Sequence, residues 1–182
     1  MRKRTIFWIT GITIIFLVTL LIYSYVIPSV NAKDVVMAGT IRQIDANAVE
    51  VELEIMRKRE DKDQHMVYPV VPGWGGATFT EELDDAWFMP SSVGTSYFDQ
   101  VILEKYLKAQ GKMRKSAENL IGFAIPDEMG SYKLRFTLRS LDGTTQPLEN
   151  PIVYYVHNEQ LLGKDLSWVT AENLEIIKED IE

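Results

Sequence analysis

The sequence predicts an N-terminal transmembrane helix followed by a mainly β outer domain, an antiparallel β-sandwich with an inserted helix and a short C-terminal helix. Three observations carry this prediction. The first is an uncharged apolar run near the N-terminus, the second is strict alternation of apolar and polar residues in several segments, and the third is the short, turn-rich connections between them. Alternating strands joined by tight turns favour antiparallel sheets over a parallel α/β arrangement.

The first element is the segment from Ile6 to Val26, which runs for 21 residues without a charge. At about 1.5 Å per residue, a helix of this length spans the roughly 30 Å hydrocarbon core of a bilayer. Arg2, Lys3 and Arg4 precede it and would hold the N-terminus in the cytoplasm. The predicted parts of the chain are a cytoplasmic basic tail (1–5), a transmembrane helix (6–27), a linker (28–36) and an extracytoplasmic β-rich domain (37–182).

The alternative to this anchor is a signal peptide cleaved after Ala32, which would release the domain as a secreted protein. The sequence Val30-Asn31-Ala32 is an acceptable cleavage pattern, but signal peptides carry a shorter apolar run of about 7–15 residues. A helix buried in a protein core is disfavoured by the basic flank and the missing polar face. We therefore expect a single-pass protein of the cell membrane with its C-terminus outside.

The charge of the chain is unevenly distributed. No acidic residue precedes Lys33, and the part after Ala32 holds 16 of the 19 Lys and Arg residues and all 26 Asp and Glu residues, a net charge of about −10. Phosphate backbones repel such a domain, so nucleic acid is excluded as a partner. The chain has no cysteine, which excludes disulfides and thiolate metal sites.

The outer domain begins with two predicted strands in 37–56, joined by a turn at Asp45-Ala46-Asn47. The second strand alternates apolar residues at 49, 51, 53 and 55 with glutamates at 50, 52 and 54, so one face is buried and the other is wet. A charged loop is expected at 57–65. The stretch 66–96 is rich in Pro, Gly and aromatics and predicts extended chain and loops with one or two short strands.

The second half of the domain begins with a predicted helix over 97–110, where Phe98, Val101, Ile102 and Tyr106 follow helical spacing. Strand, turn and strand are expected over 119–140, and the basic face of 132–139 would complement the acidic face of 49–55 if the two strands are neighbours. The further predicted elements are a strand at 150–158 and a short helix over 170–182, with a cap at Thr170 and an apolar stripe at Leu174, Ile177 and Ile181.

Residues 121–136, "IGFAIPDEMGSYKLRF", resemble the signature of the telokin-like, immunoglobulin-fold extracytoplasmic domains of Gram-positive lipoproteins and membrane-anchored proteins. The matching positions are Gly122, Phe123, Ile125, Pro126, Leu134 and Phe136. The segment "AVEVELEI" is similar to an early strand of those domains. The resemblance covers about a fifth of the outer domain. It implies an immunoglobulin-like sandwich outside the membrane and supplies no catalytic residues. The Pro/Gly-rich loop and the helix over 97–110 depart from the family pattern.

The stretch "VVPGWGGATF" at 70–79 is the most unusual in the chain. It lacks the spacing of a phosphate-binding loop, and no Lys or Arg lies between Met66 and Gln100. Exposed aromatics anchor binding partners, so Trp74, Phe79 and Trp87 are the candidate binding residues. The competing interpretation, which we favour, is that Trp74 and Trp87 fill the core or cover a sheet edge.

Candidates for chemistry are few, and we expect neither a metal nor another cofactor. A zinc site would require His65 and His157 to meet in space, and nothing in the sequence indicates that they do. The acids before His65 (Asp61 and Asp63) and those of 81–85 lack the spacing of a calcium loop. Two enzymatic arrangements were considered: Ser91 or Ser92 with His157, and the carboxylate pair of Glu81 with Asp84 or Asp85.

The expected function is therefore that of a membrane-anchored, non-catalytic binding or accessory module at the cell surface. Its partners would be the membrane and another membrane protein or a cell-envelope component. The alternative is an extracytoplasmic hydrolase.

Overall fold

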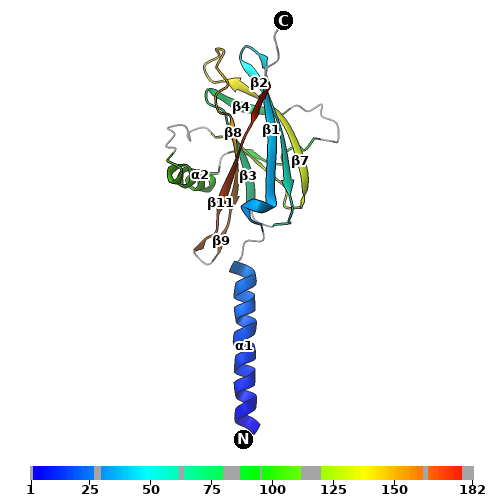
Figure 1. Cartoon of the computed structure of the whole chain (residues 1–182), viewed down its shortest axis with the longest axis vertical. Helices are drawn as coiled ribbons and strands as arrows, with labels where there is room; N and C mark the ends of the chain where they lie inside the picture. The colour runs from blue at the N-terminus through cyan, green and yellow to red at the C-terminus, as the bar shows by residue number, and fades with distance from the viewer. Residues whose placement is uncertain are drawn as a thin grey trace.

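The described part of the chain is mainly β, with two five-stranded sheets, one long N-terminal helix and one shorter inserted helix. The computed structural model describes residues 2–26, 30–61, 64–79, 87–94, 96–111, 120–161 and 164–177, with side chains of the first helix described over 8–22. Figure 1 shows the first helix, α1 (Arg2–Val26), extending away from one end of the β-domain.

The first sheet, sheet A, has the strand order β12-β1-β2-β7-β4. Its strands are β1 (Val35–Asp45), β2 (Ala48–Arg57), β4 (Trp74–Phe79), β7 (Gly130–Ser140) and β12 (Glu175–Ile177). The predicted hairpin of the first two strands is confirmed, because β1 pairs antiparallel with β2 along almost its whole length. The short β12 joins the free edge of β1 in parallel, and the other neighbours in sheet A are antiparallel.

The second sheet, sheet B, has the order β11-β8-β3-β6-β5, with antiparallel neighbours throughout. Its strands are β3 (Gln64–Val70), β5 (Val93–Gly94), β6 (Gly122–Ala124), β8 (Ile152–Asn158) and β11 (Trp168–Asn173). A two-stranded ribbon, β9 (Gln160–Leu161) with β10 (Lys164–Asp165), extends from the end of β8, and a 3₁₀ turn, η1 (Ala32–Asp34), leads into β1.

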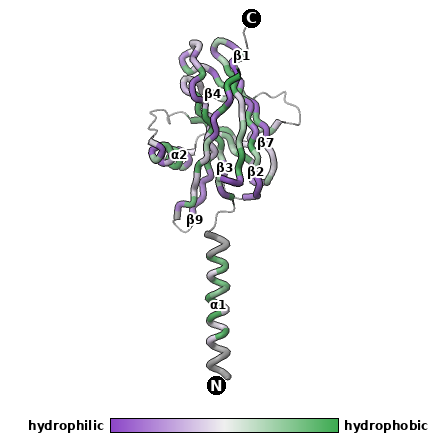
Figure 2. The backbone as a smooth tube through the Cα atoms, in the orientation of Figure 1, coloured by the Kyte–Doolittle hydropathy of each residue, from purple (hydrophilic) through white to green (hydrophobic). Residues whose placement is uncertain are grey.

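The main core lies between the two sheets. The apolar positions 49, 51, 53 and 55 of β2 are all buried, as their alternation predicts, while the glutamates between them face outward. The facing side chains of sheet B include those of Val67, Phe123, Val153 and Tyr155. In Figure 2, hydrophobic and hydrophilic residues alternate along the strands of the domain, as expected for strands with one buried and one exposed face.

The predicted neighbours with opposite charge do lie side by side. In the register of β2 with β7, Glu52 faces Arg135 and Glu54 faces Lys133. The guanidinium of Arg135 pairs with the Glu52 carboxylate at 2.7 Å. Since both groups are partly exposed, we expect this pair to contribute to strand register and only about 0.2–1 kcal/mol to stability.

The predicted inserted helix is confirmed as α2 (Tyr97–Ala109), which lies against the outer face of sheet B (Figure 1). Ser96 caps it by accepting a hydrogen bond from the backbone N–H of Asp99. The predicted apolar face is wrong at its first two positions, because Phe98 and Val101 are exposed. The buried apolar residues of α2 are Leu103 and Leu107 instead. They pack in a second core with side chains from β3 and β8, so β8 is covered on both faces.

The predicted C-terminal helix is wrong. The described part of 170–182 forms strand β11, which continues from Trp168 to Asn173, and strand β12. Each lies at the edge of a sheet: β11 hydrogen-bonds to β8, and β12 to β1. Leu174 between them is buried, and its N–H donates to the carbonyl of Pro151. The backbone hydrogen bonds available at the two sheet edges thus decide the structure of this segment against its weak helical spacing of apolar residues. Residues 178–182, including Ile181, lie outside the described residues.

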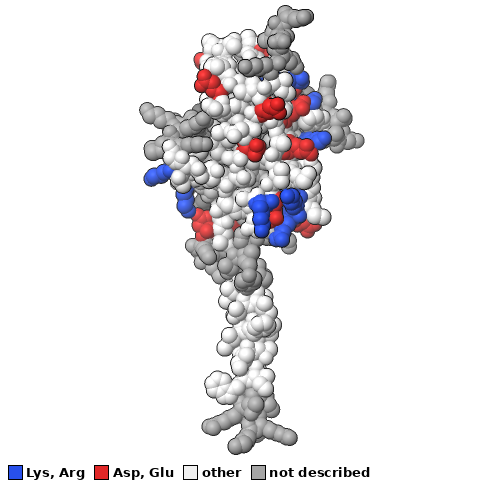
Figure 3. Space-filling view, in the orientation of Figure 1, with Lys and Arg blue, Asp and Glu red and all other residues white. Residues whose placement is uncertain are grey.

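Helix α1 carries no charged residue over 8–22, and Figure 3 shows this part as an uncharged rod below a domain that carries many charges. Its larger apolar side chains are about half exposed or more. Among the residues whose side chains the structure describes, no helix is both long and apolar enough to span a membrane.

Candidate functional site

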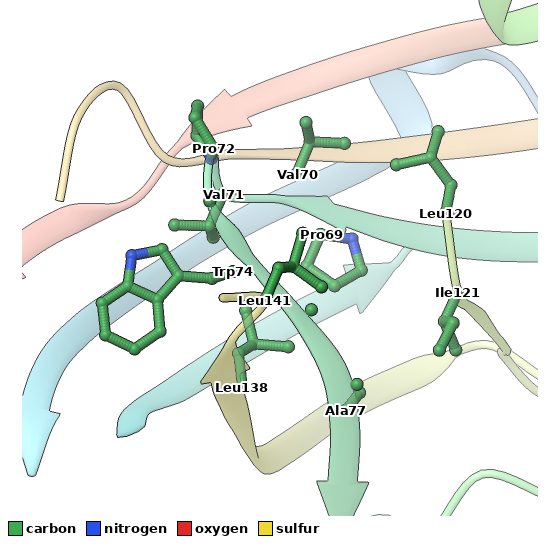
Figure 4. Close-up of a pocket in the computed structure, with 13 residues that line it drawn as sticks. Pro69, Val70, Val71, Pro72, Trp74, Ala77, Leu120, Ile121, Leu138 and Leu141 are labelled. Atoms are coloured by element: carbon green, nitrogen blue, oxygen red, sulfur yellow. The ribbon is translucent and has the colours of Figure 1, made fainter. Parts of the chain in front are cut away.

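The loop singled out in the sequence lines a surface pocket of about 280 Å³ at one end of the domain (Figure 4). The lining residues are Pro69, Val70, Val71, Pro72, Gly73, Trp74, Gly75, Gly76, Ala77, Leu120, Ile121, Leu138 and Leu141. None of these side chains carries a charge, and the only polar side-chain atom among them is the indole nitrogen of Trp74. The pocket is therefore suited to an apolar group.

The glycines of the loop are explained by its backbone. The chain turns between β3 and β4, with the Trp74 N–H donating to the carbonyl of Val71 at 3.0 Å. Gly73 has φ of +84°, and Gly76 has φ of +66°, in the left-handed region that side chains disfavour. The pairing of β4 with β7 shifts register after Gly75, and a β-bulge of this kind bends the strand. The stretch is thus a tight turn followed by a bulged strand.

Trp74 itself is buried, with 5% of its surface exposed, and it belongs to the core between the sheets. The favoured interpretation of this residue as a core side chain fits its position. The indole also forms part of the pocket wall, so this residue belongs both to the core and to the lining of the pocket.

The other two candidate aromatics lie elsewhere. Phe79, at the far end of β4, is half-buried and packs edge-on against Phe123 with ring centroids 5.0 Å apart. Trp87 is also half-buried and lies under the guanidinium of Arg135, 4.1 Å from the ring centroid. Trp74 and Phe79 therefore both belong to the main core, whereas Trp87 lies against Arg135.

The pocket lies at the end of the domain opposite to α1. Strand β1 begins at Val35, just after α1, and the turn that follows it brings Asn47 to the far end of sheet A. There the Ser140 N–H donates to the carbonyl of Asn47, and the Leu141 N–H donates to the carbonyl of Gly73 in the pocket wall. The length of β1, 11 residues at about 3.3 Å each, separates the pocket from α1.

A second candidate site is a buried cluster of Asp61, His65 and His157, which nothing in the sequence pattern brings together. The two histidines face each other in the pairing of β3 with β8, with ring centroids 4.8 Å apart. Asp61 precedes β3, and its Oδ2 lies 3.4 Å from Nε2 of His65 and 3.2 Å from Nε2 of His157. All three residues are buried, at 5% exposure or less. Asp63, which the sequence grouped with them, lies outside the described residues.

The electrostatics of this cluster keep both imidazoles neutral. Burial lowers the pKa of His65 to about 3, and the Arg57 guanidinium and His157 add to the effect. Burial also lowers the pKa of His157, although the Asp61 carboxylate opposes the shift. The buried Arg57 donates to the carbonyls of Pro126 and Arg59, which holds its charge next to the cluster. Neutral imidazoles beside a carboxylate are the protonation states that bind metal ions.

The serine and histidine candidates for hydrolysis do not form a surface site together. Ser91 and Ser92 are exposed, whereas His157 is completely buried and stacks against Trp168, so the serines and the histidine lie in different environments. Glu81, Asp84 and Asp85 lie outside the described residues.

Comparison with known proteins gives no further guide to these sites. The chain matches no protein-family model, and no curated protein sequence matches it.

Proposed function

We propose that the chain is a single-pass, membrane-anchored, non-catalytic binding module whose immunoglobulin-like outer domain presents an apolar pocket at the cell surface. The observation that carries this proposal is the pocket between β3 and β4, at the end of the domain opposite to α1. A site at that end would face away from the membrane and toward other molecules of the cell envelope. The two mainly antiparallel sheets around one core support the immunoglobulin-like arrangement.

The anchor is supported by the N-terminal segment and by the chain that follows it. The 25 residues of α1 would extend about 37 Å, enough for the hydrocarbon core. Val26 and Val30 are joined by so few residues that the gap between them is at most about 14 Å, which would hold the domain close to the bilayer.

The contacts of residues 30–32 argue against cleavage after Ala32. Val30 is completely buried in the main core, and its carbonyl accepts a hydrogen bond from the indole of Trp168 at 3.2 Å. The N–H of Asn31 donates to the carboxylate of Asp34. Cleavage at this point would remove a core side chain and these bonds from the folded domain, whereas retention of the segment keeps them.

The pocket fits an apolar side chain of a partner protein outside the membrane. Its volume lies just below the range of about 300–1,000 Å³ that is typical of sites for small-molecule ligands. The described residues of the lining offer no charge for an ionic head group, and the acidic outer domain disfavours anionic lipids and nucleic acid. Much of the binding energy of a protein interface comes from a few side chains that lie in well-packed pockets near its centre.

The test is affinity capture of the full-length protein from detergent-solubilised membranes. Leu141→Glu places a charge in the pocket at an exposed position, and Ile44→Glu places the same charge outside the pocket at a similarly exposed apolar position. We expect a specific partner with wild type and Ile44→Glu, and its loss with Leu141→Glu. Equal capture by both variants would exclude the pocket, and capture of a non-protein envelope component would correct the partner class. A mature N-terminus at Lys33 would exclude the anchor.

A further inference from the structure

The cluster of Asp61, His65 and His157 combines three potential metal-binding groups in one buried position. Their nearest ligand atoms all lie within 4.8 Å of one another. A fourth group is close by, because Oε2 of Glu159 lies 4.0 Å from Nε2 of His157. The backbone of Glu159 is held in place by Ser167, whose hydroxyl bonds to both its N–H and its carbonyl at 3.2 Å.

We propose that Asp61, His65 and His157 bind a zinc ion in a closed structural site, with Glu159 as the fourth ligand. In a tetrahedral site with metal–ligand bonds of about 2.0–2.1 Å, neighbouring ligand atoms are about 3.3–3.4 Å apart. The separations of 3.4 and 3.2 Å from Asp61 to the two imidazoles match that edge. The ligand atoms of all three side chains lie within 4.8 Å of one another, so the widest spacing would close by up to about 1.4 Å to reach that edge.

Direct hydrogen bonding to Asp61 fits the 3.2 Å separation of His157 but does not explain the position of His65. The separation of 3.4 Å between Asp61 and His65 exceeds the 2.7–3.2 Å of an ordinary N–H···O bond. Among the described residues, neither ring nitrogen of His65 has a hydrogen-bond partner, although this side chain is 1% exposed. A buried imidazole with two unsatisfied nitrogens is costly, and a metal bond to Nε2 would satisfy one of them.

The chemistry of the ligand atoms selects zinc. Two imidazole nitrogens with carboxylate oxygens suit zinc, whereas calcium and magnesium prefer oxygen ligands alone. The carboxylates of Asp61 and Glu159 would balance the two positive charges of the ion. Without the ion, the neighbouring Arg57 guanidinium makes the site less negative than the two carboxylates alone would. Asp61, His65 and His157 are each at most 5% exposed, which indicates a structural role, in which zinc is taken up as the domain folds.

Such an ion would connect three parts of the fold: the segment that precedes β3, β3 itself and the end of β8. The site is separate from the pocket, so failure of either proposal leaves the other intact.

The test uses the full-length protein in detergent, expressed without a polyhistidine tag. Metal content is measured by mass spectrometry, and melting temperature is measured for the chelator-treated protein with and without added zinc chloride. The variants are His65→Gln and His157→Gln, with Tyr68→Phe as the control, since Tyr68 is equally buried on β3 but hydrogen-bonds to Asp99. We expect about one zinc per chain and a zinc-dependent rise in melting temperature for wild type and Tyr68→Phe, with both lost in the histidine variants.

Wild type alone decides the matter if the histidine variants do not fold. Chelator-treated wild type that binds one zinc with a rise in melting temperature, and binds cobalt with the visible absorption of a tetrahedral site, supports the proposal. Wild type without bound zinc, whose melting temperature is unchanged by zinc, overturns it. Retention of one zinc per chain in folded His65→Gln and His157→Gln variants also overturns it.

Discussion

Replacement of Trp74 by alanine tests whether the tryptophan of the Gly-rich loop supports the core or contacts a partner directly. The indole is 5% exposed and packs between the sheets. Removal of a buried tryptophan side chain costs about 3–5 kcal/mol. Because the indole also borders the pocket, the space it leaves joins an existing cavity, and we expect a value near the lower end, about 3 kcal/mol. That is a large part of a typical stability of about 5–15 kcal/mol.

The matched control is Trp87→Ala. This indole is half-buried and its ring contacts the Arg135 guanidinium, so we expect its loss to cost only about 1 kcal/mol. Both variants are compared with wild type as full-length protein in detergent, by urea denaturation with a pulse of protease to digest unfolded molecules. A cost below about 1 kcal/mol for Trp74→Ala would refute the burial argument, because an exposed indole contributes little to folding.

Three further predictions concern the glycines, the surface ion pair and the turn after β7. Gly122→Ala should cost about 1–3 kcal/mol of stability, because its Cβ would lie 2.5 Å from the ring of Tyr68. A Cβ at its cross-strand partner Gly94 would meet no atom within 4 Å, so Gly94→Ala should cost less. The two variants are compared by their denaturation midpoints. Arg135→Ala should cost about 1 kcal/mol of stability in dilute buffer and less in 1 M salt, where the ion pair with Glu52 is screened. A cost that salt does not change would mean that the contact of Arg135 with the Trp87 ring dominates. For Asp142, backbone and side-chain hydrogen bonds from Thr144 hold the carboxyl pKa below its usual value of 3.8, so the ionised group stabilises the fold above that pH and this contribution falls on acidification. The difference in unfolding free energy between wild type and Asp142→Asn should therefore shrink from about pH 5 to pH 2. A difference that stays constant over this range would contradict the role of the charge.

The parts of the fold that the sequence predicted correctly are those with a strong local pattern. Alternation along β2 and β7 predicted both strands and their buried faces, and the charges on their outer faces are complementary in the observed register. The helical spacing of apolar residues over 97–110 predicted the inserted helix, although not which of them are buried. In each case the signal comes from residues within a few positions of each other, which share one element.

The errors occur where a distant segment decides the outcome. The C-terminal segment was predicted as a helix from the spacing of Leu174 and its apolar neighbours, but the free edges of β8 and β1 pair with it as strands. The exposure of Phe98 on α2 has a similar origin, because sheet B accepts Leu103 and Leu107. Local spacing indicates that a face is apolar, and the surface it meets decides which residues are buried.

The candidate sites divide in the same way. The sequence by itself determined that the chain begins with a long uncharged apolar segment, that an acidic β-domain follows, and that the Gly-rich loop lacks the chemistry of a phosphate site. Only the tertiary structure decided that Trp74 is a core residue at the wall of a pocket, and that His65 and His157, about 90 positions apart, meet at Asp61. The physical reason is that local pattern depends on near neighbours, whereas a site depends on the pairing of strands far apart in the chain.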